Sequence, residues 1–222
     1  MIGKIYKYLL DYFRSKDFLT QKIWKLKIEK KVLPIAYDLT SLVLKKSLDI
    51  YKKKQKKIFD NYLDMGCGQL AILGQYKKKI DPKTNVASAD IYHDFLENAQ
   101  LNARANNLKI EFIQTNMFEN IKDKYDLITF NPPYIPLDYK KKDIEYDKIS
   151  FAGTEGTDAI SFFLKNARNY LKKDGLIFLG VNLFYVPKKV LFEIIDLYGF
   201  KRNEVIKKFP NKSIVVVISD ND

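Results

Sequence analysis

Residues 58–68 read Ile-Phe-Asp-Asn-Tyr-Leu-Asp-Met-Gly-Cys-Gly, an apolar run that leads into an acidic residue and a Gly-x-Gly turn. The run predicts a strand over residues 58–64 that ends at Asp64. A strand, a glycine-rich turn and a helix, in this order, are typical of α/β folds that bind nucleotides. Gly66 and Gly68 would let the backbone approach a ligand where a Cβ atom would collide. A tight turn without a ligand explains the glycines equally well, so the rest of the chain must decide.

The same alternation of strands and helices continues to the end of the chain. Further strands are predicted over residues 86–89, 110–113, 125–130, 176–181, 203–207 and 214–219. Helices are predicted over residues 5–13, 18–30, 39–54, 70–79, 94–106, 158–172 and 187–198, with Asp94 as the expected N-cap of the helix 94–106. Strands that alternate with helices indicate an α/β fold, a mostly parallel sheet with helices on both faces.

The composition indicates one basic domain with a short N-terminal appendage. The 222 residues carry a net charge of +12, and residues 1–57 hold 16 Lys and Arg residues against five Asp and Glu residues. This surplus fits solvated helix faces, or a surface that faces nucleic acid or an acidic protein. No apolar run approaches the roughly 18 residues of a membrane span. The single Cys67 excludes an internal disulfide, and with the single His93 it makes a zinc site unexpected. We therefore expect a cytoplasmic protein that binds neither a metal nor a membrane.

Polar side chains stand at the ends of four predicted strands: Asp64, Asp90, Asn116 and Asn131. The carboxyl ends of parallel strands meet at one edge of a sheet, where ligands bind in open α/β folds. Asp90 can accept both hydroxyls of a ribose, and Asn116 can meet an adenine amino group while Met117 packs against the ring. The first loop has no Lys or Arg to hold a pyrophosphate, and its acidic residue suits a cationic methionine group. These residues favour S-adenosylmethionine as the ligand.

The sequence Asn131-Pro132-Pro133-Tyr134 follows the strand predicted over residues 125–130. Pro133 has a fixed φ and restricts Pro132 before it, so the turn is stiff. The side-chain oxygen of Asn131 and the carbonyl of Pro132 can together accept both hydrogens of one NH2 group, and Tyr134 can lie over a flat amide or base. The nitrogen of an amide or aryl amine is a poor nucleophile because its lone pair is delocalised, so fixed acceptors that orient it would promote methyl transfer. A proline pair that only ends a strand would explain the prolines but not their neighbours, so Asn131, Pro132 and Tyr134 are the predicted catalytic residues.

Taken in order, these segments resemble the motif set of class I S-adenosylmethionine-dependent methyltransferases. The matching stretches are Asp64–Gly68, Ala89–Ile91, Thr115–Phe118 and Tyr125–Tyr134. The resemblance implies a Rossmann-like sheet of seven strands, and a cofactor site made of Asp64, Gly66, Gly68, Asp90, Ile91, Asn116 and Met117. The chain departs from the family at Leu70, which stands where a third glycine is usual.

Residues 150–158, Ser-Phe-Ala-Gly-Thr-Glu-Gly-Thr-Asp, resemble the segment after this loop in the HemK-type enzymes, which methylate glutamine in peptide-chain release factors. Val32-Leu33-Pro34 and Tyr37–Thr40 are loosely similar to the segment before the first strand of that family. The resemblance implies a methyltransferase domain over residues 34–222 behind a basic helical extension over residues 1–33. It is closer to the compact family members, which work with a small activator subunit.

Three functions remain open on the sequence alone. The HemK resemblance implies a glutamine N5-methyltransferase whose macromolecular substrate is a release factor. The basic N-terminal part favours an N-methyltransferase of an exocyclic base amine in RNA, either tRNA or rRNA, or in DNA, because phosphate contacts come mainly from Lys and Arg. A non-catalytic cofactor-binding protein is supported only by Leu70, and the intact Asn131–Tyr134 loop speaks against it.

Overall fold

The computed structural model describes residues 12, 15–33, 36–54, 59–134, 156–207 and 212–221. Three features of the sequence lie wholly or largely outside these residues, namely the helix expected over residues 5–13, Pro34, and residues 150–155 of the HemK-like segment. Within the described part, none of the helices is long and apolar enough to cross a membrane. The same residues contain no cluster of three or more His, Cys, Asp or Glu side chains that could hold a metal ion.

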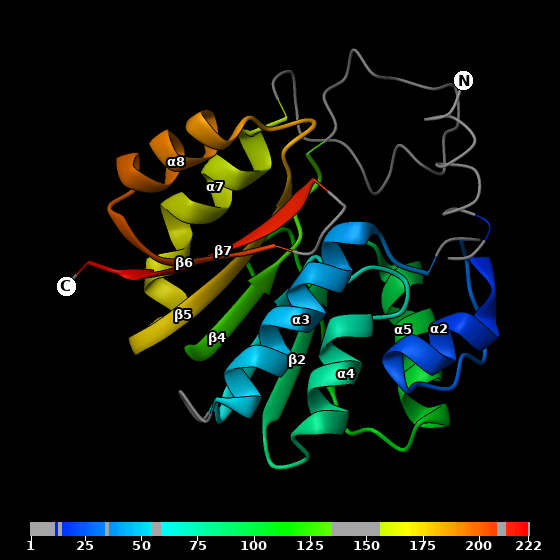
Figure 1. Cartoon of the computed structure of the whole chain (residues 1–222). Helices are drawn as coiled ribbons and strands as arrows, with labels where there is room; N and C mark the ends of the chain where they lie inside the picture. The colour runs from blue at the N-terminus through cyan, green and yellow to red at the C-terminus, as the bar shows by residue number, and fades with distance from the viewer. Residues whose placement is uncertain are drawn as a thin grey trace, which may run out of the picture.

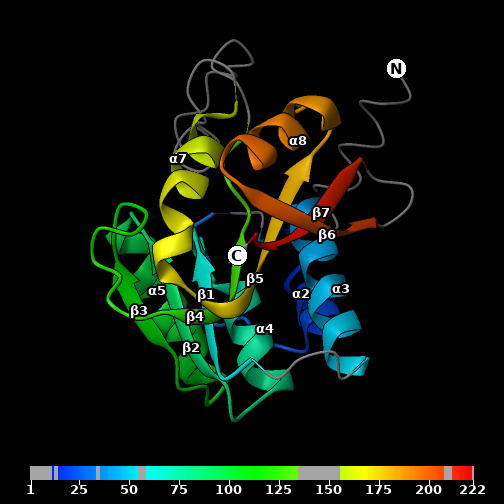
Figure 2. The same cartoon turned by 90° about the vertical axis from the view of Figure 1, so that its left-hand side faces the viewer.

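A seven-stranded sheet forms the centre of the molecule (Figures 1 and 2). Its strands are β1 (Asn61–Met65), β2 (Asn85–Asp90), β3 (Glu111–Gln114), β4 (Tyr125–Phe130), β5 (Leu171–Asn182), β6 (Phe200–Lys207) and β7 (Ser213–Asp220). Their order across the sheet is β3-β2-β1-β4-β5-β7-β6. Only β7 runs antiparallel, and it pairs in that sense with both β5 and β6. The predicted mostly parallel α/β sheet is therefore confirmed, including the strands expected at 203–207 and 214–219.

Helices cover both faces of the sheet, as Figure 1 shows. They are α2 (Asp17–Trp24), α3 (Leu39–Lys53), α4 (Ile72–Ile80), α5 (His93–Ala105), α7 (Asp158–Ala167) and α8 (Lys188–Leu197). On one face, α7 and α8 bury Phe163 and Leu191 against Ile128. On the other face, α3 buries Leu44 against Phe178. The alternating inward residues of each strand thus divide the core into two layers, because successive side chains point to opposite faces.

The N-terminal segment folds onto the domain and ends its helix earlier than predicted. Periodicity predicts a helix over residues 18–30, but α2 stops at Trp24, and Lys25 has a left-handed backbone with φ 58°. The Trp24 side chain is fully buried. Its ring lies edge-on to Tyr37, with centroids 5.4 Å apart, and to Tyr76 at 5.7 Å. The burial of this large side chain anchors the segment to α3 and α4.

The helix predicted over residues 158–172 also ends early. A short 3-10 turn (Arg168–Tyr170) follows α7, and β5 begins directly after it. The ring of Tyr170 stacks on Phe118 with centroids 4.5 Å apart, and Leu171 pairs with Tyr125 of β4. Tertiary contacts therefore override a helical pattern that continues in the sequence.

The start of α5 differs from the prediction as well. The N-cap position is Tyr92, whose side chain makes no capping bond, and Asp94 lies inside the first turn. A carboxylate in the first turn still interacts favourably with the positive end of the helix dipole.

Candidate active site

The strand order reverses at β1, which lies between β2 and β4. In an open parallel sheet such a reversal opens a crevice at the carboxyl ends of the strands, where ligands bind. Asp64 pairs with Thr129 and Met65 with Phe130, so the turn after β1 and the loop after β4 start side by side. The two motifs that the sequence singled out therefore start side by side at the point where the strand order reverses.

The turn after β1 depends on its glycines. Gly66 has φ +62° and Gly68 has φ +66°, a left-handed conformation that side chains with a Cβ atom rarely adopt. The N–H of Cys67 donates to the carbonyl of Ala89 at 3.0 Å. The Gly68 N–H donates to Oδ2 of Asp90 at 2.8 Å. Both bonds hold the turn against the end of β2.

Asp90 lies at the end of β2 and joins three segments. Its Oδ2 holds the glycine turn, and its Oδ1 accepts the N–H of Tyr92 at 3.1 Å. Its backbone carbonyl accepts the N–H of Thr115 at 2.9 Å, which brings the end of β3 alongside. Burial raises the pKa of the Asp90 carboxyl, and the backbone N–H donors oppose this rise. A carboxylate oxygen can accept more than one hydrogen bond, so both oxygens keep capacity for ligand hydroxyls.

Asp64 is deeply buried beneath the turn. Its Oδ2 accepts the N–H of Gly74 at 3.0 Å, and its Oδ1 accepts the hydroxyl of Thr129 at 3.0 Å. Burial raises the pKa of Asp64 to about 7, and these two hydrogen bonds act against it. The carboxyl therefore ties α4 and β4 to the base of the glycine turn.

The remaining predicted cofactor residues lie on the rim. Ile91 follows Asp90 with its side chain half exposed. Asn116 is exposed and donates from Nδ2 to Glu119 at 2.9 Å. Met117 has a left-handed backbone with φ 49° and packs partly against the core under α7. The structure thus gathers the predicted cofactor residues at the ends of β1, β2 and β3.

The loop after β4 presents a buried acceptor that has no partner among the residues that the structure describes. Nδ2 of Asn131 donates to Oδ1 of Asp38 at 3.1 Å. Oδ1 of Asn131 is buried, and no partner for it exists among the described residues. A buried acceptor without a hydrogen bond costs free energy unless a ligand supplies the donor. This atom is therefore available to a substrate N–H.

Pro132 and Tyr134 complete this loop and are both buried. The Tyr134 hydroxyl donates to Oδ2 of Asp38 at 2.6 Å and lies 2.9 Å from Oγ1 of Thr40. Its ring stacks on Tyr185, with centroids 5.9 Å apart. Tyr134 is thus anchored at its hydroxyl as well as through its ring.

Comparison with known proteins identifies the family of this chain. Residues 37–208 match the methyltransferase small domain family. A putative protein N5-glutamine methyltransferase from Methanocaldococcus jannaschii is 32% identical over 178 residues, which span 80% of this chain and 85% of that protein.

The chain belongs to the methyltransferase small domain family.

Other relatives share the HemK resemblance. A release factor glutamine methyltransferase from Francisella tularensis is 31% identical over 186 residues, which span 81% of this chain but 62% of that enzyme. The chain therefore spans less than two thirds of some of the curated relatives that it matches. Among solved structures, a methyltransferase from Pyrococcus furiosus superposes with a TM-score of 0.65 over 98% of both chains at 17% identity. That likeness supports the fold.

Family membership makes this chain an S-adenosylmethionine-dependent methyltransferase, and its relatives place it among the N-methyltransferases. A more distant fold relative, the T. thermophilus 16S rRNA N2 G1207 methyltransferase, was solved with this cofactor and guanosine; its TM-score is 0.58 at 19% identity, over 83% of this chain and 44% of that one. The donor set of this methyltransferase fits the cofactor, since the buried Asp90 carboxylate stands beside a turn that carries no cationic side chain.

The methyltransferase keeps its helix close to the sheet although Leu70 replaces the usual third glycine. Gly74, in the first turn of α4, lies so close to β2 that a Cβ atom would stand 2.2 Å from Oγ of Ser88. Close helix–strand packing is one of the roles of the third glycine in nucleotide-binding turns. We infer that Gly74 takes over this role, which its wider spacing in the sequence concealed.

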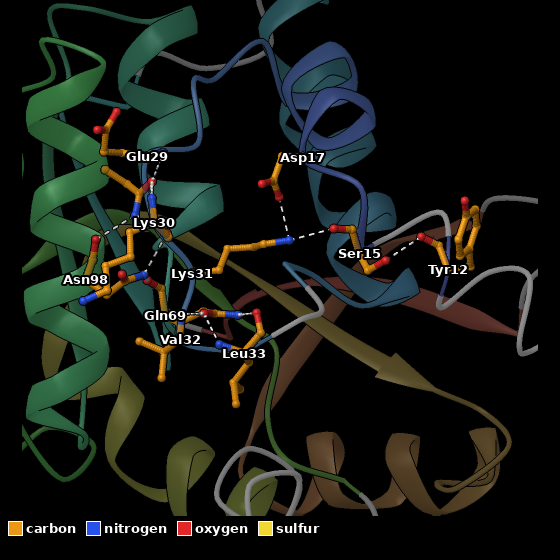
Figure 3. A network of polar contacts seen from close by, with 11 residues as sticks. Tyr12, Ser15, Asp17, Glu29, Lys30, Lys31, Val32, Leu33, Gln69 and Asn98 are labelled. Carbon is orange, nitrogen blue, oxygen red and sulfur yellow. Dashed lines mark hydrogen bonds and ion pairs between the residues drawn. The ribbon is translucent and has the colours of Figure 1, made fainter.

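Gln69 is a second residue that the sequence interpretation missed. Its side chain accepts the N–H groups of Val32 at 2.6 Å and Leu33 at 2.7 Å, and donates to the Leu33 carbonyl at 3.0 Å (Figure 3). Asn98 of α5 donates to the Gln69 carbonyl at 2.7 Å. The N-terminal segment is thus tied directly to the cofactor turn, which no local pattern announces.

Proposed function

We propose that this methyltransferase transfers a methyl group to the side-chain amide nitrogen of a glutamine in a peptide-chain release factor. The proposal rests chiefly on the buried Oδ1 of Asn131, which lacks a partner among the described residues. It is supported by relatives named for N5-glutamine and release-factor methylation. The basic N-terminal surface would meet an acidic substrate, and the lone Cys67 suits the reducing cytoplasm.

The chain's own residues would act by positioning. S-adenosylmethionine supplies the methyl group on a positively charged sulfur. Oδ1 of Asn131 and the carbonyl of Pro132 would each accept one hydrogen of the substrate NH2 group, which turns the nitrogen lone pair toward the methyl carbon. On transfer the sulfur would keep the electron pair of its bond to the methyl group, and the substrate nitrogen would form the new bond and give one proton to solvent water. Two fixed acceptors also stabilise the positive charge that develops on the nitrogen.

An N-methyltransferase of an exocyclic base amine in RNA or DNA is the alternative. It is favoured by the surplus of 11 positive charges in residues 1–57. Both substrates present an NH2 group on a planar system, so the Asn131 loop alone does not separate them. Binding of nucleic acid should weaken steeply with salt, because each neutralised phosphate releases counterions.

A methyl-transfer assay separates the two. Purified chain and tritiated S-adenosylmethionine are incubated side by side with release factor, tRNA, rRNA and DNA, and mass spectrometry locates the methyl group. We expect N5-methylglutamine in the release factor and no label in the nucleic acids. Label in RNA or DNA alone would replace the proposal with the alternative. The resemblance also implies a small activator subunit. Full activity of the purified chain alone would contradict the need for such a subunit.

Asn131→Ala tests the acceptor in the same assay. The rate of methyl transfer at saturating cofactor should fall by about 10²–10³, as when one preorganised polar contact to a transition state is removed. Cofactor affinity measured by calorimetry should hold, because Asn131 is assigned to the substrate nitrogen. Transfer at the wild-type rate would make the loop a structural turn.

A further inference from the structure

Asp38 has no assigned role in binding the cofactor or the substrate, yet it contacts two side chains of the loop after β4, those of Asn131 and Tyr134. It is the N-cap of α3, where Oδ1 accepts the N–H of Ser41 at 2.7 Å. The hydroxyl of Ser41 also donates to Oδ1, at 2.8 Å. The helix, and not the loop, therefore fixes the place of this carboxylate.

From this fixed place Asp38 determines which way the Asn131 amide faces. An ionised carboxylate only accepts hydrogen bonds, so Asn131 must turn its NH2 group toward it. The observed bond from Nδ2 to Oδ1 of Asp38 at 3.1 Å has this polarity. The opposite end of the amide, Oδ1, is then directed away from Asp38 and stays buried without a partner among the described residues.

The carboxylate also acts on the strength of the acceptor. An amide whose N–H donates to a charged acceptor becomes polarised, and its oxygen accepts more strongly, because hydrogen bonds in a chain reinforce one another at low dielectric. Tyr134 occupies the second oxygen of Asp38 at 2.6 Å. Both oxygens of Asp38 therefore have fixed donors, which holds the carboxylate plane in one orientation.

We propose that Asp38 is a positioning residue for methyl transfer: it locks the amide of Asn131 with Oδ1 toward the substrate NH2 group and strengthens that oxygen as an acceptor. Asp38 itself touches neither substrate nor cofactor. The inference rests on the proposed function only in assuming a substrate nitrogen that carries hydrogens. It predicts that Asn131 orients the substrate nitrogen less well when a neutral side chain of the same shape replaces Asp38.

The test is Asp38→Asn, which keeps the size and the capping ability of the side chain, since Asn and Asp are equally good N-caps. With release factor as substrate, kcat should fall roughly tenfold to a hundredfold, the loss typical of outer residues that orient a functional group. The cofactor Kd and the melting temperature should hold. The matched control is Asp49→Asn within α3, because Asp49 also accepts from a tyrosine hydroxyl, that of Tyr76, and its second oxygen accepts from Lys45 instead of an asparagine of the loop. The control should keep the wild-type kcat.

A second measurement does not need the substrate. The side-chain NH2 signals of Asn131 in an NMR spectrum are assigned by their loss in Asn131→Ala. The proton donated to Asp38 should exchange slowly with solvent in the wild type and about tenfold faster in Asp38→Ser, because serine is still a good N-cap but its shorter side chain removes the carboxylate that accepts from Asn131. Unchanged exchange in Asp38→Ser, or an unchanged kcat in Asp38→Asn, overturns the inference. If the wild type does not methylate release factor, the proposed function fails while the exchange measurement still decides the role of Asp38.

Discussion

The hydroxyl of Tyr134 lies in a row of polar side chains that runs from Asp38 to Ser213. It donates to Asp38 and lies within bonding distance of Thr40, whose own hydroxyl donates to Ser213 at 2.8 Å. Burial, reinforced by the charge of Asp38, raises the pKa of Tyr134 well above its ordinary value, so the hydroxyl stays protonated and can donate at neutral pH. The sequence suggested a ring that lies over a flat substrate group, and that role remains a prediction.

Tyr134→Phe separates the ring from the hydroxyl. The variant keeps the aromatic surface but leaves Oδ2 of Asp38 without its donor, and a buried acceptor that loses its partner costs about 1–3 kcal/mol. We expect a lower free energy of unfolding in urea and a reduced kcat. If both quantities match the wild type, the ring alone matters and the bond to Asp38 is dispensable.

Single residues of the site were predictable where the fold itself places them. Asp64, Asp90 and Asn131 lie at or next to the carboxyl ends of β1, β2 and β4, and the carboxyl ends of parallel strands must share one edge of the sheet. The bond between Asp38 and Asn131 joins residues 93 positions apart, and no spacing in the sequence encodes it. The same holds for Gln69, whose partners Val32 and Leu33 precede it by more than 30 positions.

Among the elements, α5 does more than cover the sheet. Asn98, Asn102 and Asn106 recur every fourth residue and face the extended backbone of residues 27–30. Asn102 is fully buried, accepts the N–H of Glu29 at 2.8 Å and donates to the carbonyl of Lys30 at 2.8 Å. These side chains satisfy backbone groups that no strand pairs with, and buried backbone groups require such partners.

Asn102→Ala should therefore loosen the N-terminal segment. The N–H of Glu29 would lose its partner and the carbonyl of Lys30 would keep only Asn98, which predicts a loss of about 1–3 kcal/mol in the free energy of unfolding. Asn166→Ala on α7 is the control, since Asn166 donates to the carbonyl of Phe162 within its own helix. That change should stay within about 0.5 kcal/mol. Equal effects of the two substitutions in urea unfolding would contradict the role assigned to Asn102.

Element types were easier to predict than element ends. The strand predicted at 125–130 matches β4, because a short apolar run between polar residues leaves little choice. The helix expected over residues 18–30 stops at Trp24, because its continuation is held as extended backbone by α5. The helical spacing of apolar residues cannot reveal that Asn102, 73 positions away in the sequence, binds this backbone.

At the scale of the whole molecule, the positive charge is concentrated in the N-terminal quarter. The net charge is +12, and residues 1–57 carry a surplus of 11. A separate extension over residues 1–33 before a domain over residues 34–222 stays a proposal. Within the described residues, Trp24 and Leu26 are buried in the same core cluster as α3 and α4. Deleting residues 1–33 would therefore remove core side chains. The role of their positive charge in substrate binding must be tested by substitution instead.

The N-terminal segment has four exposed lysines: Lys22, Lys25, Lys27 and Lys30. They precede Val32, whose backbone N–H donates to Gln69 in the cofactor turn. Their joint replacement by glutamine should raise KM for the macromolecular substrate severalfold and flatten its dependence on salt, because surface charges act mainly on encounter with the partner. The kcat at saturating substrate should hold, since none of these side chains belongs to the proposed catalytic loop.

The matched control removes four exposed lysines outside this segment, which precede or begin β2, β4 and β5: Lys83, Lys122, Lys124 and Lys173. It changes the net charge by the same amount, so a general effect of charge would appear equally in both variants. The slope of log KM against log salt concentration shows whether the N-terminal lysines bind the substrate themselves or whether only the net charge of the protein attracts it. A nucleic acid substrate would lose about 0.9 from that slope for each phosphate contact removed. If both variants keep the wild-type KM and slope, the N-terminal lysines are only a solvated surface. The residues that bind the substrate must then be sought at the carboxyl ends of β1 and β4.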